Sequence, residues 1–522
     1  MFLRTDATNK LAGGFSGLLK GMLLTFFGQT SHNMEKSGIS LTLADGSHHL
    51  VFMRLACFVA DEAALHYGYC NKGASGLKPC ILCANVFHHN LRHEIVERDT
   101  TGMAQHHTTH DASKLKFHTP QSIASIVHRL SNSYGTLSKA QFTELERTLG
   151  WNYSPHGVMW NPITRPLVDP SSIAAYDWMH VVFVSGVFGV TLGQVMRNLK
   201  DEGVTYAVLH NYIQKFTWPA HTKKIGKEAC IPERARSSWA NHVFKCSASE
   251  GLSLAPVFEN FFSEFIHRHP SPSALAKGIA SNFLQLLGVV HLIVKCRSCD
   301  VSPLELQKAI KDFVYGYGRL HGPDTMIIKF HLLLHLPFHL KKYGFLPNCF
   351  VHERKHKCSK RFANNSCNTD AGWEGSLLRE ITCHHLYALQ NEDDNRFGLE
   401  PALVNASPPA AKLLAALTHQ FGPGDYTVAS SARLASSERV SVGDVVLYRG
   451  GAGKLGMLVK AKVHGGDDIT AALLNGFTHV RKTRKGDEWQ MTDTMQICLL
   501  SAITGAVVWS EVDGRVLTLN PL

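Results

Sequence analysis

The chain has 522 residues, of which 44% are hydrophobic and 18% are charged, with 53 Lys and Arg against 42 Asp and Glu and a net charge of +11. At about 100–200 residues per domain this length predicts two to four domains, and the composition excludes a largely disordered chain. The longest apolar stretches, 181–196 and 283–294, fall short of the ~20 residues of a membrane span, so we expect a soluble intracellular protein without a membrane partner. The excess of positive charge suits a polyanionic partner.

The first predicted elements are a helix over 9–28 and a strand over 39–43. The apolar run 50–60 then predicts a long, mostly buried strand that ends at Asp61. A carboxylate at the carboxyl end of a central strand is a frequent position for catalytic groups. Taken alone, Asp61 is better explained as the N-cap of a helix over 63–69.

From about 120 to 320 the pattern is predominantly helical, because apolar residues recur three and four positions apart. A further helix is expected near 375–389, and the acidic, proline-bearing segment 391–409 predicts a linker. Beyond about 434, short β-rich runs between Gly and Asp turns predict a small antiparallel barrel, SH3-like or tudor-like. The helices expected in the central region cover 137–149, 173–196, 204–216, 256–268, 273–296 and 303–320.

Two cysteine pairs have the spacing of a metal-binding knuckle. Cys80 and Cys83 follow Gly-Leu-Lys-Pro, and such a pair can present two thiolates to one tetrahedral metal ion. A lone pair of this kind is explained equally well as a redox pair or a core pair. For Cys296 and Cys299, which close a predicted helix, the structural explanation is the better one.

A histidine pair lies much further along the chain. His331 and His335 are four positions apart, which places both imidazoles on one face of a helix, within reach of a single zinc ion. In so apolar a segment, a hydrogen-bonded core pair is the slightly better explanation when the pair is taken alone.

A basic segment follows the histidine pair. Between 341 and 361 there are seven Lys or Arg residues and one acid, Glu353. A solvated helix face would normally intersperse both signs of charge, whereas a groove for a polyanion with one acidic metal ligand would have this composition. A solvated face remains the alternative explanation for the basic residues.

In their order along the chain, these motifs resemble the transposases of the CACTA (En/Spm-like) superfamily. These are DDE-type enzymes in which an RNase H-like catalytic core is split by a large helical insertion. The resemblance covers roughly 35–365 and rests on Ala60-Asp-Glu-Ala-Ala64, Cys80-x-x-Cys83, Asp177-Trp-Met-His180, Lys329-x-His-x-x-x-His-x-Pro337 and Phe350-x-x-Glu-x-x-His-Lys357.

The resemblance implies a role for each motif. Asp61 matches the second catalytic Asp of the family, Glu353 matches its final Glu, and Asp177 and His180 match the Asp-x-x-His motif of the insertion. The related V(D)J recombinase catalytic subunit binds zinc through a similar CxxC and a distant His pair. By that similarity, one structural Zn²⁺ site would be formed by Cys80, Cys83, His331 and His335.

The fold that the resemblance implies is α+β, with an incomplete RNase H-like core, a large all-helical insertion and a small antiparallel β-barrel at the C-terminal end. The expected segments are the first part of the core with the CxxC pair at 1–95, the helical insertion at 96–325, the second part of the core with the His pair and the Glu helix at 326–390, a linker at 391–433 and the barrel at 434–522.

The activity that the resemblance implies is metal-dependent DNA cleavage and strand transfer at transposon terminal repeats, in the nucleus. Three carboxylates would hold two Mg²⁺ or Mn²⁺ ions ~4 Å apart. The family's first Asp has no counterpart, because only Asp6 and Asp45 precede Asp61 and neither ends a predicted strand, so the chain is expected to be inactive alone. The phosphates beside the scissile bond would be neutralised by Lys341, Lys342, Arg354, Lys355 and Lys357.

Two other functions fit the same residues. One is a non-catalytic, zinc-stabilised DNA-binding protein, which keeps the knuckle, the His pair and the basic segment. The other is an interaction scaffold whose terminal barrel binds a protein or chromatin partner. A homo-oligomer is compatible with each of these functions, and the barrel's partner is open.

Overall fold

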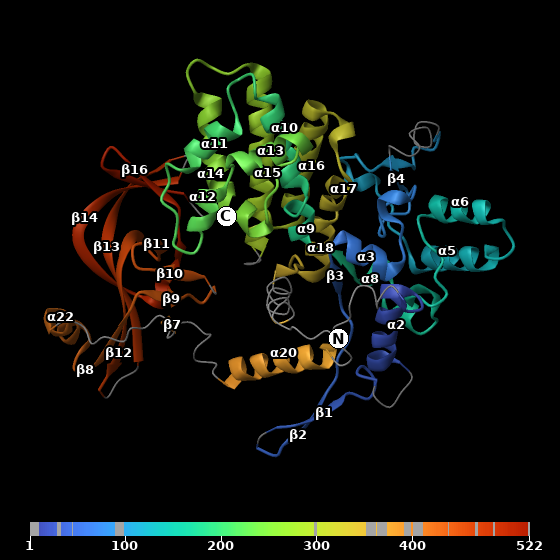
Figure 1. Cartoon of the computed structure of the whole chain (residues 1–522), viewed down its shortest axis with the longest axis horizontal. Coiled ribbons are helices and arrows are strands. Elements are labelled where there is room, and N and C mark those ends of the chain that lie inside the picture. The colour runs from blue at the N-terminus through green and yellow to red at the C-terminus, as the bar shows by residue number, and fades with distance from the viewer. Residues whose placement is uncertain are drawn as a thin grey trace. The chain divides into compact units, whose positions relative to one another are not determined.

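The computed structural model of the chain describes residues 10–28, 33–43, 45–88, 99–296, 300–350, 362, 373–390, 398–399, 411–436, 438–464, 468–483 and 486–519 (Figure 1). The chain divides into two compact units. Unit 1 combines Met1–Thr191 with Gly288–Leu378, and unit 2 combines Leu192–Leu287 with Arg379–Leu522. Each unit is therefore built from two stretches that are far apart in the sequence, and neither coincides with one of the five predicted segments.

Unit 1 contains the elements that surround the candidate site. Three helices run across the limits of the two units, namely α10 (Val187–Asn198), α15 (Ala274–Lys295) and α20 (Trp373–Gln390). The elements within unit 1 are α2 (Gly14–Phe27), β1 (Ile39–Thr42), β2 (His48–Val51), β3 (Phe58–Ala60), α3 (Glu62–Tyr69), β4 (Val86–Phe87), β5 (Gln105–His106), α5 (Pro120–Ser133), α6 (Lys139–Leu149), α7 (Thr164–Leu167), α8 (Pro170–Ile173), β6 (Ala174–Tyr176), α9 (Trp178–Val182), α16 (Pro303–His321), α17 (Ile328–Leu333) and α18 (Leu336–Tyr343).

The strands of unit 1 are short and pair in twos. β1 and β2 form an antiparallel hairpin, while β3 pairs in parallel with β6. The predicted strand over 50–60 is wrong in its extent, because β2 ends at Val51 and β3 begins at Phe58. A strand needs a hydrogen-bonded neighbour, and here β1 and β6 supply neighbours for its two ends only. Among the described residues of this unit the remaining strand pair is β4 with β5, so an RNase H-like sheet is not confirmed.

The helix predicted over 173–196 is wrong at its start and in its continuity, because α9 and α10 cover only Trp178–Val182 and Val187–Asn198. The predicted all-helical character of the insertion is wrong as well. Residues Ala174–Tyr176 form β6 instead of a helical turn. Asp177 then begins α9, because its carboxylate accepts a hydrogen bond from the backbone N–H of Met179. Ser185, in a left-handed conformation with φ of 45°, lies between α9 and α10. The local pattern is apolar enough for a helix, but pairing with the distant β3 takes precedence over it.

Other predicted helices are confirmed, with ends set by their caps. The helix expected over 137–149 is α6, which begins after a capping box made by Ser138 and Gln141 and ends at Gly150. The helix expected over 303–320 is α16, whose cap Ser302 accepts from the backbone of Glu305. Asp61 caps α3, as the simpler explanation of that residue predicted.

Unit 2 joins a helical part to an antiparallel sheet. The two parts are in contact, since Thr217 and Trp509 exchange backbone hydrogen bonds of 2.7 and 3.1 Å. Its elements are α11 (Tyr206–Ile213), α12 (Lys223–Glu228), α13 (Pro232–Asn241), α14 (Ala248–His267), β7 (Gly398–Leu399), α22 (Ala411–Phe421), β8 (Gly424–Ala429), β9 (Ser431–Arg433), β10 (Arg439–Ser441), β11 (Val445–Tyr448), β12 (Gly451–Val463), β13 (Asp468–Thr483), β14 (Gly486–Leu499), β15 (Ile503–Ala506), β16 (Trp509–Val512) and β17 (Arg515–Thr518).

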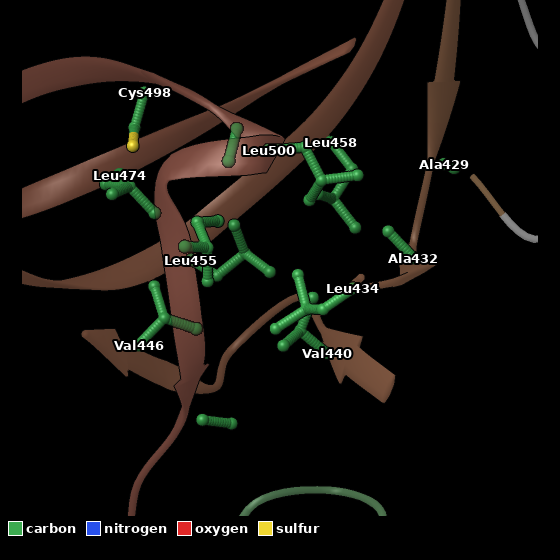
Figure 2. Close-up of a cluster of buried hydrophobic side chains, with 13 residues drawn as sticks. Ala429, Ala432, Leu434, Val440, Val446, Leu455, Leu458, Leu474, Cys498 and Leu500 are labelled. Atoms are coloured by element: carbon green, nitrogen blue, oxygen red, sulfur yellow. The ribbon is translucent and has the colours of Figure 1, made fainter. Parts of the chain in front are cut away.

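The predicted C-terminal β region is confirmed as a multi-strand antiparallel sheet. Within the described residues it has eight strands, in the order β15-β11-β12-β13-β14-β17-β16, with β8 paired to β12. Alternate side chains from these strands build an apolar core, in which Leu455, Leu458 and Leu474 are fully buried (Figure 2). Among the described strands, β15 and β16 at the two ends do not pair with each other, so an SH3-like or tudor-like barrel is not confirmed. The sheet also includes β8, which lies in the predicted linker.

Two described stretches are long and apolar enough to cross a membrane by length and composition. They are Trp178–Asn198 and Ala274–Lys295, with mean hydropathies of 1.6 and 1.4. Within the protein, 83% of the first window and 50% of the second are buried, as in the core helices of many folds. Two such helices are weak evidence for a membrane span, and they give no support to a protein with many spans.

Candidate metal centre

The structure brings together the four side chains that the sequence assigned to a metal site. The Nε2 atom of His335 lies 3.3 Å from Sγ of Cys80, 3.6 Å from Sγ of Cys83 and 3.1 Å from Nε2 of His331. All four ligand atoms lie within 4.8 Å of one another, and all four residues are buried. Two thiols and two imidazoles are a tetrahedral donor set of the kind that zinc prefers. The cluster could therefore hold a metal ion such as zinc.

The two histidines reach the cluster from different helical segments. His331 lies in α17, which ends at Leu333, and His335 is the residue before α18. Pro337 lies in the first turn of α18, where its missing N–H costs no hydrogen bond. The single helix expected for the pair is therefore two short helices, and the four-residue spacing still brings both imidazoles to one place.

The electrostatics of the cluster favour the metal-binding forms of His331 and Cys80 but not that of Cys83, because burial and the neighbouring Cys80 raise the pKa of the Cys83 thiol well above its ordinary value. Burial lowers the pKa of His331, which keeps the imidazole neutral and able to coordinate. Burial opposes ionisation of Cys80, but the hydrogen bond with Cys83 and the nearby imidazoles of His335 and His331 bring the pKa of its thiol well below the ordinary value. The Nδ1 atoms of both histidines are buried and, within the described residues, have no hydrogen-bond partner.

The cysteine knuckle is fixed by the segment that precedes α5. The backbone N–H of His118 donates to the carbonyl of Leu82 at 2.7 Å, and Ala84 donates to Lys116 at 2.8 Å. Phe117 forms an isolated antiparallel bridge with Cys83. This segment thus supports the loop that carries Cys80 and Cys83 and includes a buried side chain, since His118 is 4% exposed.

His118 makes the stability of unit 1 depend on pH. Burial, helped by the nearby Lys78, lowers the pKa of His118 from 6.5 to about 4. The unfolded chain takes up a proton at this residue below about pH 6.5, whereas the folded chain stays neutral there until about pH 4. The contribution is therefore complete above pH 6.5 and is lost as the pH falls towards 4, at about 1.36 kcal/mol per unit and roughly 3 kcal/mol in total.

We expect the substitution His118→Gln to remove this part of the pH dependence, because glutamine does not titrate. The measurement is the free energy of unfolding by urea at intervals between pH 7 and 4.5, and the difference between the two proteins isolates His118. Parallel curves for wild type and variant would contradict the assignment.

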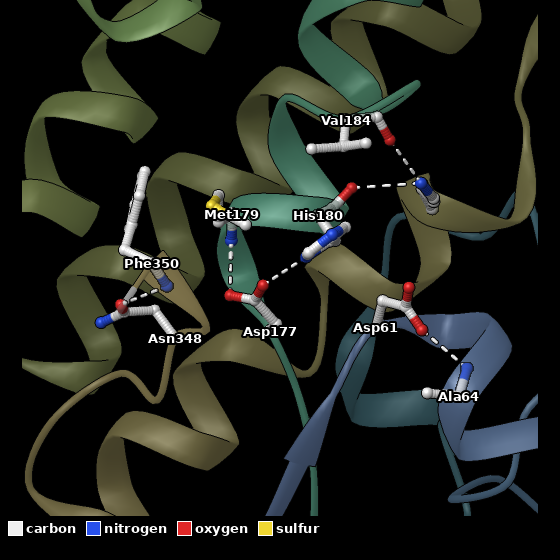
Figure 3. A network of polar contacts seen from close by, with 9 residues as sticks. Asp61, Ala64, Asp177, Met179, His180, Val184, Asn348 and Phe350 are labelled. Atoms are coloured by element: carbon white, nitrogen blue, oxygen red, sulfur yellow. Dashed lines mark hydrogen bonds and ion pairs between the residues drawn. The ribbon is translucent and has the colours of Figure 1, made fainter. Parts of the chain in front are cut away.

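A pair of carboxylates lies at one end of the β3–β6 pair. Ala60 is opposite Tyr176 in the parallel register, so Asp61 and Asp177 are the next residues of neighbouring strands (Figure 3). The backbone N–H of Asp177 donates to the carbonyl of Ala60 at 3.1 Å. The carboxyl ends of parallel strands meet at the same edge of a sheet, so both carboxylates are directed to that edge.

Each carboxylate is held by a backbone donor at the start of a helix. Asp61 accepts from the N–H of Ala64 at 2.6 Å and Asp177 accepts from the N–H of Met179 at 3.0 Å. The second oxygen of Asp177 contacts Nδ1 of His180, so the two residues of the Asp-x-x-His motif are in direct contact. Asp177 is 1% exposed, and this burial makes it a fixed rather than a solvated acid.

Lys329 lies in α17, which also carries the metal ligand His331, and connects this helix to the carboxylate pair. Its ammonium group donates to the carbonyls of His180 and Val184 at 3.1 and 2.7 Å (Figure 3). Burial lowers the pKa of Lys329, and the negative charges of Glu62, Asp61 and Asp177 oppose this effect. Lys329 is part of the Lys-x-His motif and has no predicted role, although a lysine in an otherwise apolar segment is a signal for one.

The remaining predicted site residues fall into two groups. Lys341 and Lys342 are both exposed, and the ammonium group of Lys342 donates to the carbonyl of Ser172 and lies 5.2 Å from the ring centroid of Tyr343. The others lie outside the described residues, namely Glu353, Arg354, Lys355 and Lys357. Cys296, of the second cysteine pair, is buried, and its thiol donates a hydrogen bond to the carbonyl of Leu292. This agrees with the prediction that Cys296 has a structural role.

Comparisons with known proteins add no relative to this picture. A scan against protein-family models, a search of curated proteins and a search of solved structures each gave no match to the chain. The evidence for two sites is therefore their geometry alone. One is the cluster of Cys80, Cys83, His331 and His335, called the Cys80–His335 cluster below, and the other is the Asp61–Asp177 pair.

Proposed function

We propose that the chain is a transposase-like protein that cleaves DNA strands with the help of a divalent cation held by Asp61 and Asp177. The observation that carries the proposal is the placement of these carboxylates on adjacent parallel strand ends. Two acidic oxygens fixed on rigid strands are a suitable start for a Mg²⁺ or Mn²⁺ site. When bound there, such a cation would activate the attacking oxygen and stabilise the leaving oxygen of a phosphodiester.

In this proposal Asp177 supplies the second carboxylate, so no acidic residue upstream of Asp61 is needed for the pair. The hydrogen bonds from Met179 and His180 orient Asp177, and Lys329 anchors the turn that follows α9. Glu353 is the third carboxylate by resemblance. Zn²⁺ is the proposed ion at the Cys80–His335 cluster, where it would join the loop before β4 to α17. Its role would be structural, and the carboxylates would hold the catalytic cation.

The same proposal covers the partner and the location. DNA would contact the basic segment that begins with the exposed Lys341, and transposon ends in the nucleus are the expected target. Contacts with phosphates would make the affinity fall steeply with salt. We also expect that the chain forms a homo-oligomer and that the sheet of unit 2 binds a partner.

One observation favours a second candidate, the non-catalytic zinc-stabilised DNA-binding protein. The described residues contain one group of three or more possible metal ligands, which is the Cys80–His335 cluster. Within the same residues, no third ligand joins Asp61 and Asp177. The two carboxylates would then serve as the helix caps that they are in α3 and α9.

A nicking assay separates the two candidates. The full chain is incubated with supercoiled plasmid DNA and Mg²⁺ or Mn²⁺, with EDTA as the control. Cation-dependent conversion to the nicked circle supports the enzyme, and binding of DNA without any nicking supports the non-catalytic protein.

A further inference from the structure

Tyr176 lies between the metal centre and the carboxylate pair. It is the last residue of β6, directly before Asp177, and is 1% exposed. Its ring is stacked against that of His335, with centroids 5.9 Å apart and an interplanar angle of 24°. Its hydroxyl oxygen lies 3.6 Å from Sγ of Cys80.

The hydroxyl of Tyr176 has two hydrogen-bond partners, both in the cysteine knuckle. The backbone N–H of Ile81 donates to the hydroxyl oxygen at 3.4 Å, so the oxygen is an acceptor on that side. A phenol has a single proton, and the sulfur of Cys80 is the acceptor within reach of it. A Cys80 thiolate bound to a metal has no proton to donate, so in the metal-loaded centre Tyr176 is the donor to this sulfur.

The backbone of Tyr176 is held from the same direction. Its N–H donates to Nε2 of His339 at 3.3 Å, and His339 is fully buried one turn beyond His335. On the other side, the N–H of Asp177 donates to Ala60. The position of Asp177 thus depends on a residue whose side chain and backbone both contact the metal-binding elements.

We infer that Tyr176 is a positioning residue that couples the Cys80–His335 metal centre to the carboxylate of Asp177. This inference rests on the proposed function for the role of Asp177, and on the Cys80 contact alone for the metal centre. Hydrogen bonds from outside the ligand set orient metal ligands, and removing one typically weakens metal binding about 10- to 100-fold. Because β6 is held through the same residue, a cation at Asp61 and Asp177 binds more tightly when the metal centre is filled.

The first experiment loads the full chain with Co²⁺ as a spectroscopic probe. Tyr176→Phe keeps the ring and removes the donor to Cys80, so we expect Co²⁺ affinity to fall about 10- to 100-fold and the sulfur-to-cobalt charge-transfer band to shift. The matched control is Tyr69→Phe, since Tyr69 is fully buried and its hydroxyl has no partner among the described residues. Identical affinity and spectrum in the two variants would overturn the contact. If Tyr176→Phe does not fold, difluorotyrosine at position 176, a stronger donor of the same shape, must shift the band in the opposite direction to a lost donor.

The second experiment measures Mn²⁺ binding by electron paramagnetic resonance in the zinc-loaded chain. Wild type and Tyr69→Phe should bind Mn²⁺ at the carboxylate pair, Asp177→Asn should lose it, and Tyr176→Phe should bind it more weakly. Failure of the wild type to bind Mn²⁺ would refute the proposed function. Normal binding by Tyr176→Phe, where Asp177→Asn has lost it, would refute the coupling while leaving the proposed function in place.

Discussion

The double substitution Cys80→Ala with His331→Ala is expected to abolish metal binding and to destabilise unit 1 severely. Wild type should hold about one zinc ion per chain, and the variant none, because two of the four ligand atoms within 4.8 Å of one another are gone. Structural zinc contributes about 10 kcal/mol to folding in small peptides, and a larger unit with its own core should lose part of that. Metal analysis of the purified chain and urea unfolding measure the two effects.

The matched control replaces a buried cysteine and a buried histidine outside the cluster. Cys296→Ala with His107→Ala removes comparable buried groups of unit 1, at 1% and 0% exposure. This control should lose stability through its cavities and keep its zinc. A full zinc content in the Cys80 and His331 variant would show that the cluster is a core pair of thiols and imidazoles without a metal.

Replacing either strand-end carboxylate is expected to remove cation-dependent DNA nicking. Asp61→Asn and Asp177→Asn each remove one negative charge at the edge where β3 and β6 end, and each keeps the shape of the side chain nearly unchanged. A catalytic metal site supplies several kcal/mol of transition-state stabilisation, so the rate should fall by roughly 1000-fold or more. The measurement is the initial rate of nicking with Mn²⁺ at equal DNA occupancy.

Asp169→Asn is the control for this loss. Asp169 is a buried acid of the same unit, 7% exposed, and its carboxylate accepts from the hydroxyl of Ser171. This variant should nick DNA at nearly the wild-type rate. If Asp177→Asn nicks as fast as Asp169→Asn, Asp177 is a helix cap and an orienting partner of His180, and the proposed active site is wrong.

Local chemistry marked the four residues as possible metal ligands, although neither pair taken alone favoured a metal over a pair in the core. The CxxC spacing and the four-residue spacing of the histidines each place two donors together, whatever the surrounding fold. Apolar spacing likewise predicted α6 and α16, and the structure adds their caps Ser138 and Ser302, which act within one turn. That the two pairs form one site was implied only by the family resemblance, since their meeting depends on packing between distant segments.

The carboxylate pair could not be found in the same way. The strand Ala174–Tyr176 has only three residues, and its partner lies in another part of the chain. Helical periodicity is assessed over stretches longer than such a strand, so the apolar spacing of 173–196 predicts a single helix. The pattern therefore predicts Asp177 and Tyr176 inside one helix and gives no sign that Asp177 lies beside Asp61. Contacts of this kind are properties of the tertiary structure.

The separation of the metal ligands along the chain has a consequence for biosynthesis. Cys80 and its ligand partner His335 are 255 residues apart. At about 5–20 residues per second, the ribosome needs roughly 13 to 50 s to complete the second half of the site after the first has emerged. During that interval the two thiols of the knuckle have no imidazole partners and are open to oxidation. Newly made chains are therefore most vulnerable to oxidants before translation has passed the second histidine, and protection of the nascent knuckle should raise the yield of folded protein.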